Sequence, residues 1–211
     1  MSVSTSPRRS SAVDRLLKLA RSRAIFRARD VAKLGIHTGT LTKMARAGEL
    51  ERVGAGRYKL KLPAKRRITE HHDLVEAASA VPWSVVCLVS ALRFHNLGTQ
   101  LPHQVWLAVP RGTRVPQLAV PLLRIVNISP AVFDIGIEEH RLEGQVVKVY
   151  NVARTVADCF RFRNTVGLDV ALEALTEAWR SRRLNLDELN RIAKRLRVQR
   201  VMQPYLDTVV L

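Results

Sequence analysis

Positive charge is concentrated in the first third of this 211-residue chain, and this separation constrains its folding more than any other feature of the sequence. Residues 1–67 carry eighteen Lys and Arg against four acidic residues, a net charge of +14, whereas residues 68–211 carry a net charge of only +3. A merely soluble protein has no reason to segregate its charge in this way. The first third is therefore expected to be a specialised module with a polyanionic partner.

The overall composition is that of a globular protein. Apolar residues make up 47% of the chain and charged residues 25%, which argues against a disordered polypeptide. The longest apolar stretch, residues 81–92, contains two serines and is too short to cross a membrane. With only two cysteines, Cys87 and Cys159, the chain has no disulfide framework or cysteine zinc cluster. No apolar run of signal-peptide length follows Arg8 and Arg9, so we expect a reducing, cytoplasmic setting.

The spacing of apolar residues in the first sixty positions predicts three helices followed by a hairpin. Residues 12–24 place apolar side chains at helical spacing, a short second helix follows Phe26, and a third helix begins at Thr38 as its N-cap. Two short strands, 50–53 and 57–60, are joined by a glycine turn. This order is that of a winged helix-turn-helix domain, whose third helix enters the major groove of DNA.

Candidate DNA-binding side chains lie on the third helix and on the hairpin. We expect the helix to turn Leu41 and Met44 inward and to offer its other face to base edges and phosphates. Small residues in its first turn would let the backbone approach the bases, and the hairpin cations would meet phosphate or the minor groove. The candidates are Thr38, Gly39, Thr40, Thr42, Lys43, Arg46, Arg52, Arg57 and Lys59. With about six to ten phosphate contacts, affinity would fall about 10³–10⁵-fold between 50 and 200 mM salt.

Several of these residues also have simpler structural interpretations. Thr38 then only caps its helix, and Gly39 is an ordinary loop residue. Arg52 and Lys59 are then edge-strand charges that discourage strand pairing. Combined with the net charge of +14, DNA binding explains the whole set better than these separate roles.

The rest of the chain predicts an α+β fold in which a mixed sheet is followed by a helical C-terminal part. The expected helices are 69–80, 84–97, 151–162, 168–180, 186–196 and 199–209, and the expected strands are 104–109, 120–128, 135–142 and 145–150. Asn151, Asn164 and Asn185 stand where helix caps are needed. The expected domains are a flexible basic arm (1–11), the winged helix (12–62), a basic linker (63–68) and the α+β domain (69–211).

Positive charge returns near the C-terminus, where residues 179–200 hold eight Lys and Arg against two acidic residues. Two interpretations stay open: a pair of solvated helix faces, or a second surface for an anionic partner. Arg154 and Asp158, four residues apart on one helix, are expected to pair across a turn and to fix the junction between hairpin and helix. The alternative is that Arg154 contacts a partner.

Few side chains in the second domain suggest catalysis. His71 and His72 are adjacent on a helix and point about 100° apart, so a solvated helix start is favoured over a metal site. Asp134 and Glu139 only loosely match a nuclease pattern, because its lysine is missing. Cys159 is expected to be a small core residue. We therefore expect neither enzyme activity nor a metal or cofactor, and a DNA-processing enzyme is the alternative.

Several segments, taken in order, carry a resemblance to a known family. They are FRARDVA (26–32), RAGEL (46–50), ERVGAGRY (51–58), SALRFHNLG (90–98), VWLAVP (105–110) and ARTVAD (153–158). The set closely resembles the AbiEi antitoxins of type IV toxin–antitoxin systems, over nearly the whole chain from about residue 12. The first three segments lie in the predicted winged helix, and the others are similar to the second domain of that family.

The resemblance implies an antitoxin with two activities. Its N-terminal domain would bind double-stranded promoter DNA, usually at inverted repeats, and repress its own operon. Its second domain would counteract a nucleotidyltransferase toxin in phage defence, and would assist operator binding or self-association. No membrane partner is implied. The residues themselves leave another class open, a winged-helix transcription factor whose second domain binds a small ligand.

Overall fold

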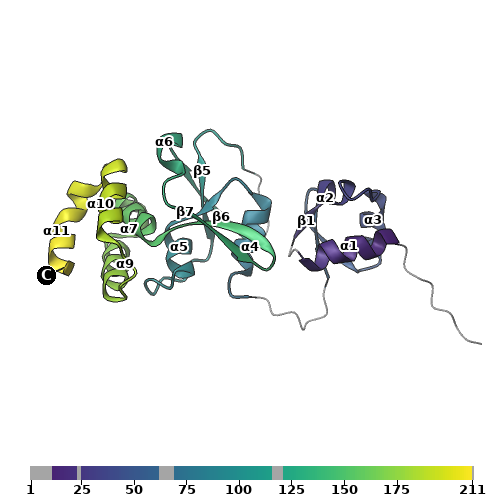
Figure 1. Cartoon of the computed structure of the whole chain (residues 1–211), viewed down its shortest axis with the longest axis horizontal. Coiled ribbons are helices and arrows are strands. Elements are labelled where there is room, and N and C mark those ends of the chain that lie inside the picture. Colours follow the sequence, from purple (N-terminus) through teal and green to yellow (C-terminus); the bar gives the residue numbers. More distant parts are fainter. Residues whose placement is uncertain (1–10, 23–24, 62–68, 116–120, 211) are drawn as a thin grey trace, which may run out of the picture. The chain divides into compact units, whose positions relative to one another are not determined.

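The structure is a computed structural model that describes residues 11–22, 25–61, 69–115 and 121–210 (Figure 1). The chain divides into two compact units. The first comprises Met1–Ser79 and Leu142–Gln145, and the second comprises Ala80–Arg141 and Val146–Leu211. The predicted linker, 63–68, and all but the last residue of the predicted arm, 1–11, lie outside the described residues.

Helices and a small sheet make up the first unit. Its helices are α1 (Ser11–Ser22), α2 (Ala28–Ala32), α3 (Gly39–Arg46) and nearly all of α4 (His72–Ala80). Its strands are β1 (Phe26–Arg27), β2 (Leu50–Gly54) and β3 (Arg57–Leu60). They form an antiparallel sheet in the order β1-β3-β2. The predicted helix–helix–turn–helix–hairpin order is confirmed, and β1 is an additional strand that periodicity did not predict.

A small apolar core joins these elements. Leu16, Leu17 and Ala20 of α1 are buried, as their helical spacing predicts, and Ile36 packs inward before α3. Gly35 has a φ of +69°, the left-handed conformation that glycine adopts easily at the end of a helix. The other members of this core are Phe26, Val31, Leu41, Met44, Leu50 and Tyr58.

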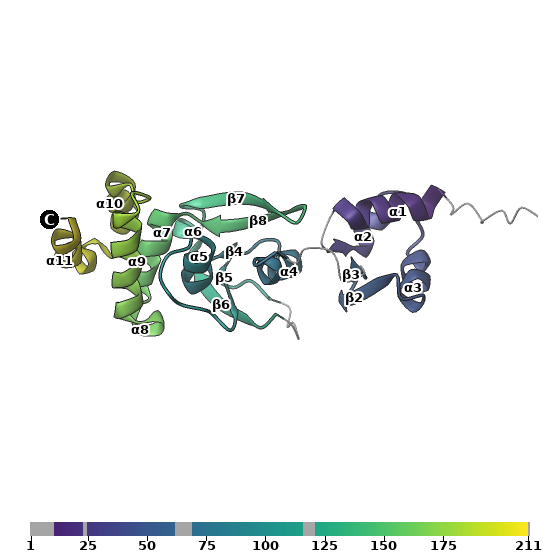
Figure 2. The same ribbon diagram turned by 90° about the horizontal axis from the view of Figure 1, so that it is seen from below.

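The second unit is built on a mixed five-stranded sheet with helices following it (Figure 2). The strands, in the order β6-β5-β4-β8-β7, are β4 (Val85–Val86), β5 (Val105–Pro110), β6 (Leu123–Ile128), β7 (Ile137–Leu142) and β8 (Gln145–Tyr150). The helices are α5 (Leu88–Phe94), α6 (Pro130–Phe133), α7 (Val152–Arg161), α8 (Arg163–Val166), α9 (Leu168–Arg180), α10 (Leu186–Arg195) and α11 (Gln199–Val210). The predicted α+β class with a helical C-terminal part is confirmed.

Helix α7 lies at the centre of the second unit. It packs against α5, α9 and α10, and its residues 153–160 are buried. Val156, Cys159 and Phe160 are fully buried within the main core. Asn151 caps this helix by accepting a hydrogen bond from the Arg154 amide, as predicted.

Two predictions for the second unit are wrong. Residues 84–97 do not form one helix, because Val85 and Val86 form the central strand β4 before α5 begins. Asn164 lies inside the short helix α8 and is not a cap. The third predicted cap is confirmed, since the Asn185 side chain accepts from the Glu188 amide.

Candidate nucleic-acid interface

Helix α3 has the two faces that a recognition helix needs. Leu41 and Met44 are buried and hold the helix on the core of the first unit. Thr42, Lys43 and Arg46 are exposed on the opposite side. The division predicted from the sequence is therefore present, and it leaves one hydroxyl and two cations available to a duplex.

The start of α3 differs from the prediction. Thr38 occupies the N-cap position, but its φ and ψ of −61° and −23° are helical and its side chain makes no capping bond. His37 takes this role, because its Nδ1 accepts from the Gly39 amide at 3.1 Å. A Cβ on Gly39 would lie 2.9 Å from that nitrogen, so glycine leaves room for the bond. Thr38 is exposed, whereas Gly39 and Thr40 are half-buried.

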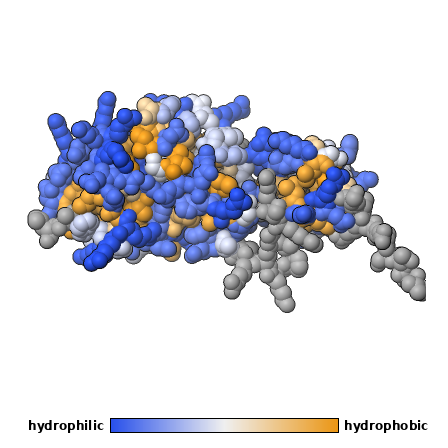
Figure 3. Space-filling model, in the orientation of Figure 1, coloured by the Kyte–Doolittle hydropathy of each residue, from blue (hydrophilic) through white to orange (hydrophobic). Residues whose placement is uncertain are grey.

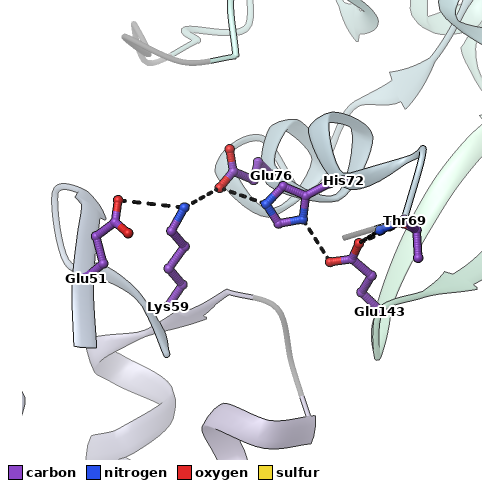
Figure 4. Close-up of polar contacts among 6 residues, drawn as sticks. All are labelled: Glu51, Lys59, Thr69, His72, Glu76 and Glu143. Atoms are coloured by element: carbon purple, nitrogen blue, oxygen red, sulfur yellow. Dashed lines mark hydrogen bonds and ion pairs between the residues drawn. The ribbon is translucent and has the colours of Figure 1, made fainter. Parts of the chain in front are cut away.

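The hairpin β2–β3 presents its three candidate cations differently. Arg52 is exposed, and its Nε donates to the Gly54 carbonyl at 3.4 Å. Arg57 is half-buried and lies beside Gly54. Because glycine has no side chain, it leaves room for the Arg57 guanidinium, and a Cβ at this position would be 3.3 Å from Arg57 Nε. Lys59 is held by carboxylates, with its Nζ 3.2 Å from Glu76 and 3.7 Å from Glu51 (Figure 4).

The histidines at the start of α4 are half-buried, and His72 lies between two carboxylates. His72 Nδ1 lies 2.9 Å from Glu143 Oε2, and His72 Nε2 lies 3.4 Å from Glu76 Oε1. Burial acts to raise the pKa of Glu143, but hydrogen bonds from Thr69 and His72 outweigh it and leave this pKa below its ordinary value. Among the residues that the structure describes, no group of three or more His, Cys, Asp and Glu is arranged to hold a metal.

Arg154 and Asp158 form a buried ion pair. Arg154 Nε donates to Asp158 Oδ2 at 2.8 Å, and the side chains are 0% and 1% exposed. Arg154 Nη1 also donates to the carbonyls of Val132 and Ile135, at 2.6 and 2.8 Å. The predicted junction is confirmed. The alternative, a contact between Arg154 and a partner, is wrong because the side chain does not reach the surface.

The other residues considered for catalysis, Asp134, Glu139 and Cys159, differ in their surroundings. Asp134 is exposed at the end of α6, and Glu139 on β7 is exposed and 3.9 Å from Lys148 Nζ. Cys159 is buried as predicted, and burial raises the pKa of its thiol far above the ordinary value.

The basic residues near the C-terminus are all on the surface. On the face seen in Figure 3, hydrophilic side chains project from the helical end of the second unit. Arg183 donates to the carbonyl of His95 and so serves partly as a structural tie. The exposed cations of this region are Arg180, Arg182, Arg183, Arg191, Lys194, Arg195, Arg197 and Arg200. Both interpretations of this surface stay predictions.

The fold and the exposed face of α3 define a winged helix-turn-helix module followed by an α+β unit. Residues 14–58 match the model of a family described as transcriptional regulator, AbiEi antitoxin. The resemblance is therefore confirmed for the N-terminal region, which is about a fifth of the chain. None of the curated proteins compared with the chain matches it.

A solved structure shares the fold. The RV2827C protein from Mycobacterium tuberculosis superimposes with a TM-score of 0.54 at 12% identity. The match covers 95% of this chain and 82% of that protein. At this low identity the likeness concerns the fold alone. Within the described residues, every helix falls short of the length and apolar character that a bilayer span requires.

Proposed function

We propose that this chain is a type IV antitoxin that represses its own operon by binding promoter DNA through α3 and the β2–β3 hairpin. The observation that carries the proposal is the exposed face of α3, with Thr42, Lys43 and Arg46 opposite the buried Leu41 and Met44. It lies in the part of the chain that carries a net charge of +14 and matches a family of transcriptional regulators. Lys and Arg on such a face read guanine edges or bind phosphate.

The candidate DNA-binding set remains Thr38, Gly39, Thr40, Thr42, Lys43, Arg46, Arg52, Arg57 and Lys59. Two copies are proposed to bind one inverted repeat in the cytoplasm, because a winged helix reads a single half-site. The domain limits at 12–62 and 69–211 are part of the same proposal. No catalytic residue, metal or cofactor belongs to it.

The test is a fluorescence anisotropy titration of the full chain. One duplex comes from the DNA upstream of its own coding sequence, and a second has the same composition in shuffled order. We expect the upstream duplex to bind at least tenfold more tightly, since specific sites exceed non-specific ones by several orders of magnitude. Equal affinity for both duplexes contradicts autorepression. Loss of binding on addition of a small metabolite would favour a ligand-responsive transcription factor instead.

The antitoxin activity needs a separate test. Co-expression of the full chain with a nucleotidyltransferase encoded beside it is expected to restore growth that the enzyme alone arrests. The nucleotidyltransferase expressed with an unrelated winged-helix protein is the control. Continued growth arrest in the presence of the folded chain contradicts the antitoxin part of the proposal and leaves DNA binding unaffected.

A further inference from the structure

One face of the β1-β3-β2 sheet carries three cations. Side chains alternate along a strand, and Tyr58 is buried in the core, so Arg57 and Lys59 point to the opposite face. Arg27 stands directly across from Arg57 and shares that face. Burial, together with the charges of Arg29 and Arg57, lowers the pKa of Arg27, as expected where cations are crowded.

Helix α4 supplies acceptors to two of these cations. Glu76 Oε1 lies 3.2 Å from Lys59 Nζ, and the Ser79 carbonyl accepts from Arg27 Nη2 at 2.9 Å. Residues three apart lie on the same side of a helix, so both contacts use one face of α4. All of these residues belong to the first unit. The Glu76 carboxylate thus stands against a cation of the sheet that is a candidate for phosphate binding.

The position of Glu76 is fixed by further contacts. His72, one turn earlier on α4, places Nε2 3.4 Å from the Glu76 carboxylate and Nδ1 2.9 Å from Glu143 (Figure 4). Glu143 in turn accepts from the amide and the hydroxyl of Thr69. The Glu76 side chain is only 11% exposed and that of Lys59 27%, so solvent screens this pair less than a surface pair. A fixed carboxylate, rather than a mobile one, therefore meets Lys59.

We propose that Glu76 competes with DNA phosphate for Lys59 and thereby limits the affinity of the chain for non-specific duplex. This inference rests on the proposed function. A carboxylate and a phosphate bind the same ammonium donors, and Lys59 has four rotatable side-chain bonds with which to exchange one for the other. While Glu76 holds Lys59, a duplex gains one phosphate contact fewer. Sequence-independent phosphate contacts then contribute less to the total affinity. The base contacts of α3 therefore account for a larger share of it, and the ratio of specific to non-specific affinity rises.

The decisive measurement is the salt dependence of binding to the shuffled duplex. Glu76→Gln keeps the shape of the side chain and removes its charge. We expect the slope of log K against log salt to steepen by about 0.9, which corresponds to one additional phosphate contact. Over a fourfold change in salt, this is about a 3.5-fold larger loss of affinity than in the unmodified chain. Glu70→Gln is the matched control, since Glu70 precedes α4 and is 71% exposed.

The Lys59→Ala variant tests whether the steeper salt slope of Glu76→Gln comes from Lys59. In the unmodified chain Lys59→Ala should flatten the slope less than it does in the Glu76→Gln chain, because Glu76 competes with phosphate for Lys59. In the Glu76→Gln chain it should remove the whole gain. Thermal unfolding of each variant reports on folding, and a purely structural role of Glu76 would lower the unfolding temperature without changing the slope.

Three results overturn the inference. They are a slope for Glu76→Gln equal to that of the unmodified chain, a gain that persists without Lys59, and a gain equal to that of Glu70→Gln, which reflects only the change in net charge. Equal affinity of the unmodified chain for upstream and shuffled duplex contradicts autorepression. In that case the steeper slope of Glu76→Gln still supports competition for Lys59.

Discussion

Arg154 shows how a strongly polar residue becomes part of a core. Its guanidinium pairs with Asp158, donates to two backbone carbonyls and lies 4.2 Å from the centre of the Tyr150 ring. Burying a charge without such partners costs several kcal/mol, so the guanidinium depends on these partners being in place when the core forms. The side chain therefore joins α7 to the segment around α6, and its charge is not available to DNA or a toxin.

Arg154→Leu is expected to destabilise the chain by about 3–5 kcal/mol, because it leaves the Asp158 carboxylate buried without its partner. Urea unfolding followed by circular dichroism measures this change. Arg180→Leu, at the exposed end of α9, is the matched control and should change stability by less than about 0.5 kcal/mol. Similar midpoints for the two variants would show that the ion pair does not stabilise the fold.

We expect His95 to make the stability of the chain depend on pH. It is buried, its Nε2 lies 2.7 Å from the Tyr150 carbonyl, and burial lowers its pKa from the ordinary value of 6.5. Below pH 6.5 the unfolded chain therefore binds more protons at this site than the folded chain, and the free energy of unfolding falls until the lower folded pKa is passed.

His95→Gln should reduce this pH dependence. The free energy of unfolding, measured by urea at about pH 5 and pH 7.5, should differ less in this variant than in the unmodified chain. The exposed His103, changed to Gln, is the control and should leave the dependence unaltered. An unchanged difference in the His95 variant would mean that this histidine does not take up a proton on unfolding.

At the scale of an element, α3 carries the most direct prediction. Lys43→Ala and Arg46→Ala should each weaken binding to the upstream duplex by about 1–3 kcal/mol if these side chains read bases. Binding to the shuffled duplex should change less, because base contacts are lost only at the specific site. Anisotropy titrations measure both. Lys148→Ala, on β8 and paired with Glu139, is the control that should alter neither.

The hairpin β2–β3 is expected to act on phosphate instead. Arg57→Ala should weaken binding to both duplexes by a similar factor and flatten the salt slope by about one unit. Titrations between 50 and 200 mM salt measure this slope. A loss confined to the upstream duplex would instead place Arg57 at a base edge.

Elements held by local chemistry are the ones that could be predicted from the sequence. Asn151 and Asn185 cap α7 and α10 within one turn, and the apolar spacing of α1 is set by residues of that helix, among them the buried Leu16, Leu17 and Ala20. The two-residue strands escaped prediction because long-range pairing defines them. Val86, for example, pairs with Leu107 and Val149. The apolar periodicity of one segment carries no information about which distant strand it pairs with.

The candidate site was also predictable only where local chemistry determines it. The two faces of α3 follow from helical spacing, so the exposure of Lys43 and Arg46 was predictable. The partners of Lys59 were only half predictable. Glu51 stands directly across the hairpin, whereas Glu76 belongs to α4, seventeen residues away in the sequence. The proximity of these charges depends on how the first unit folds.

For the whole molecule, the proposed activities should be separable. A Lys43→Ala/Arg46→Ala chain should lose repression of a reporter placed behind the upstream DNA, because its base contacts are missing. It should still restore growth when co-expressed with the neighbouring nucleotidyltransferase, since neither side chain belongs to the second unit. Reporter fluorescence and growth rate are the two measurements. Loss of both in a folded double variant would show that protection from the toxin proceeds through DNA.

The long-range pairing of β4 also sets the order in which the two parts of the chain can fold during synthesis. Every buried member of the core that supports α3 lies between Leu16 and Tyr58, whereas Val86 meets its parallel partner Val149 only after much more of the chain has been made. Domains generally fold as they are synthesised, and distant pairings form late. The proposed DNA-binding module can thus fold while the second half of the chain still lacks β8, the parallel partner of β4.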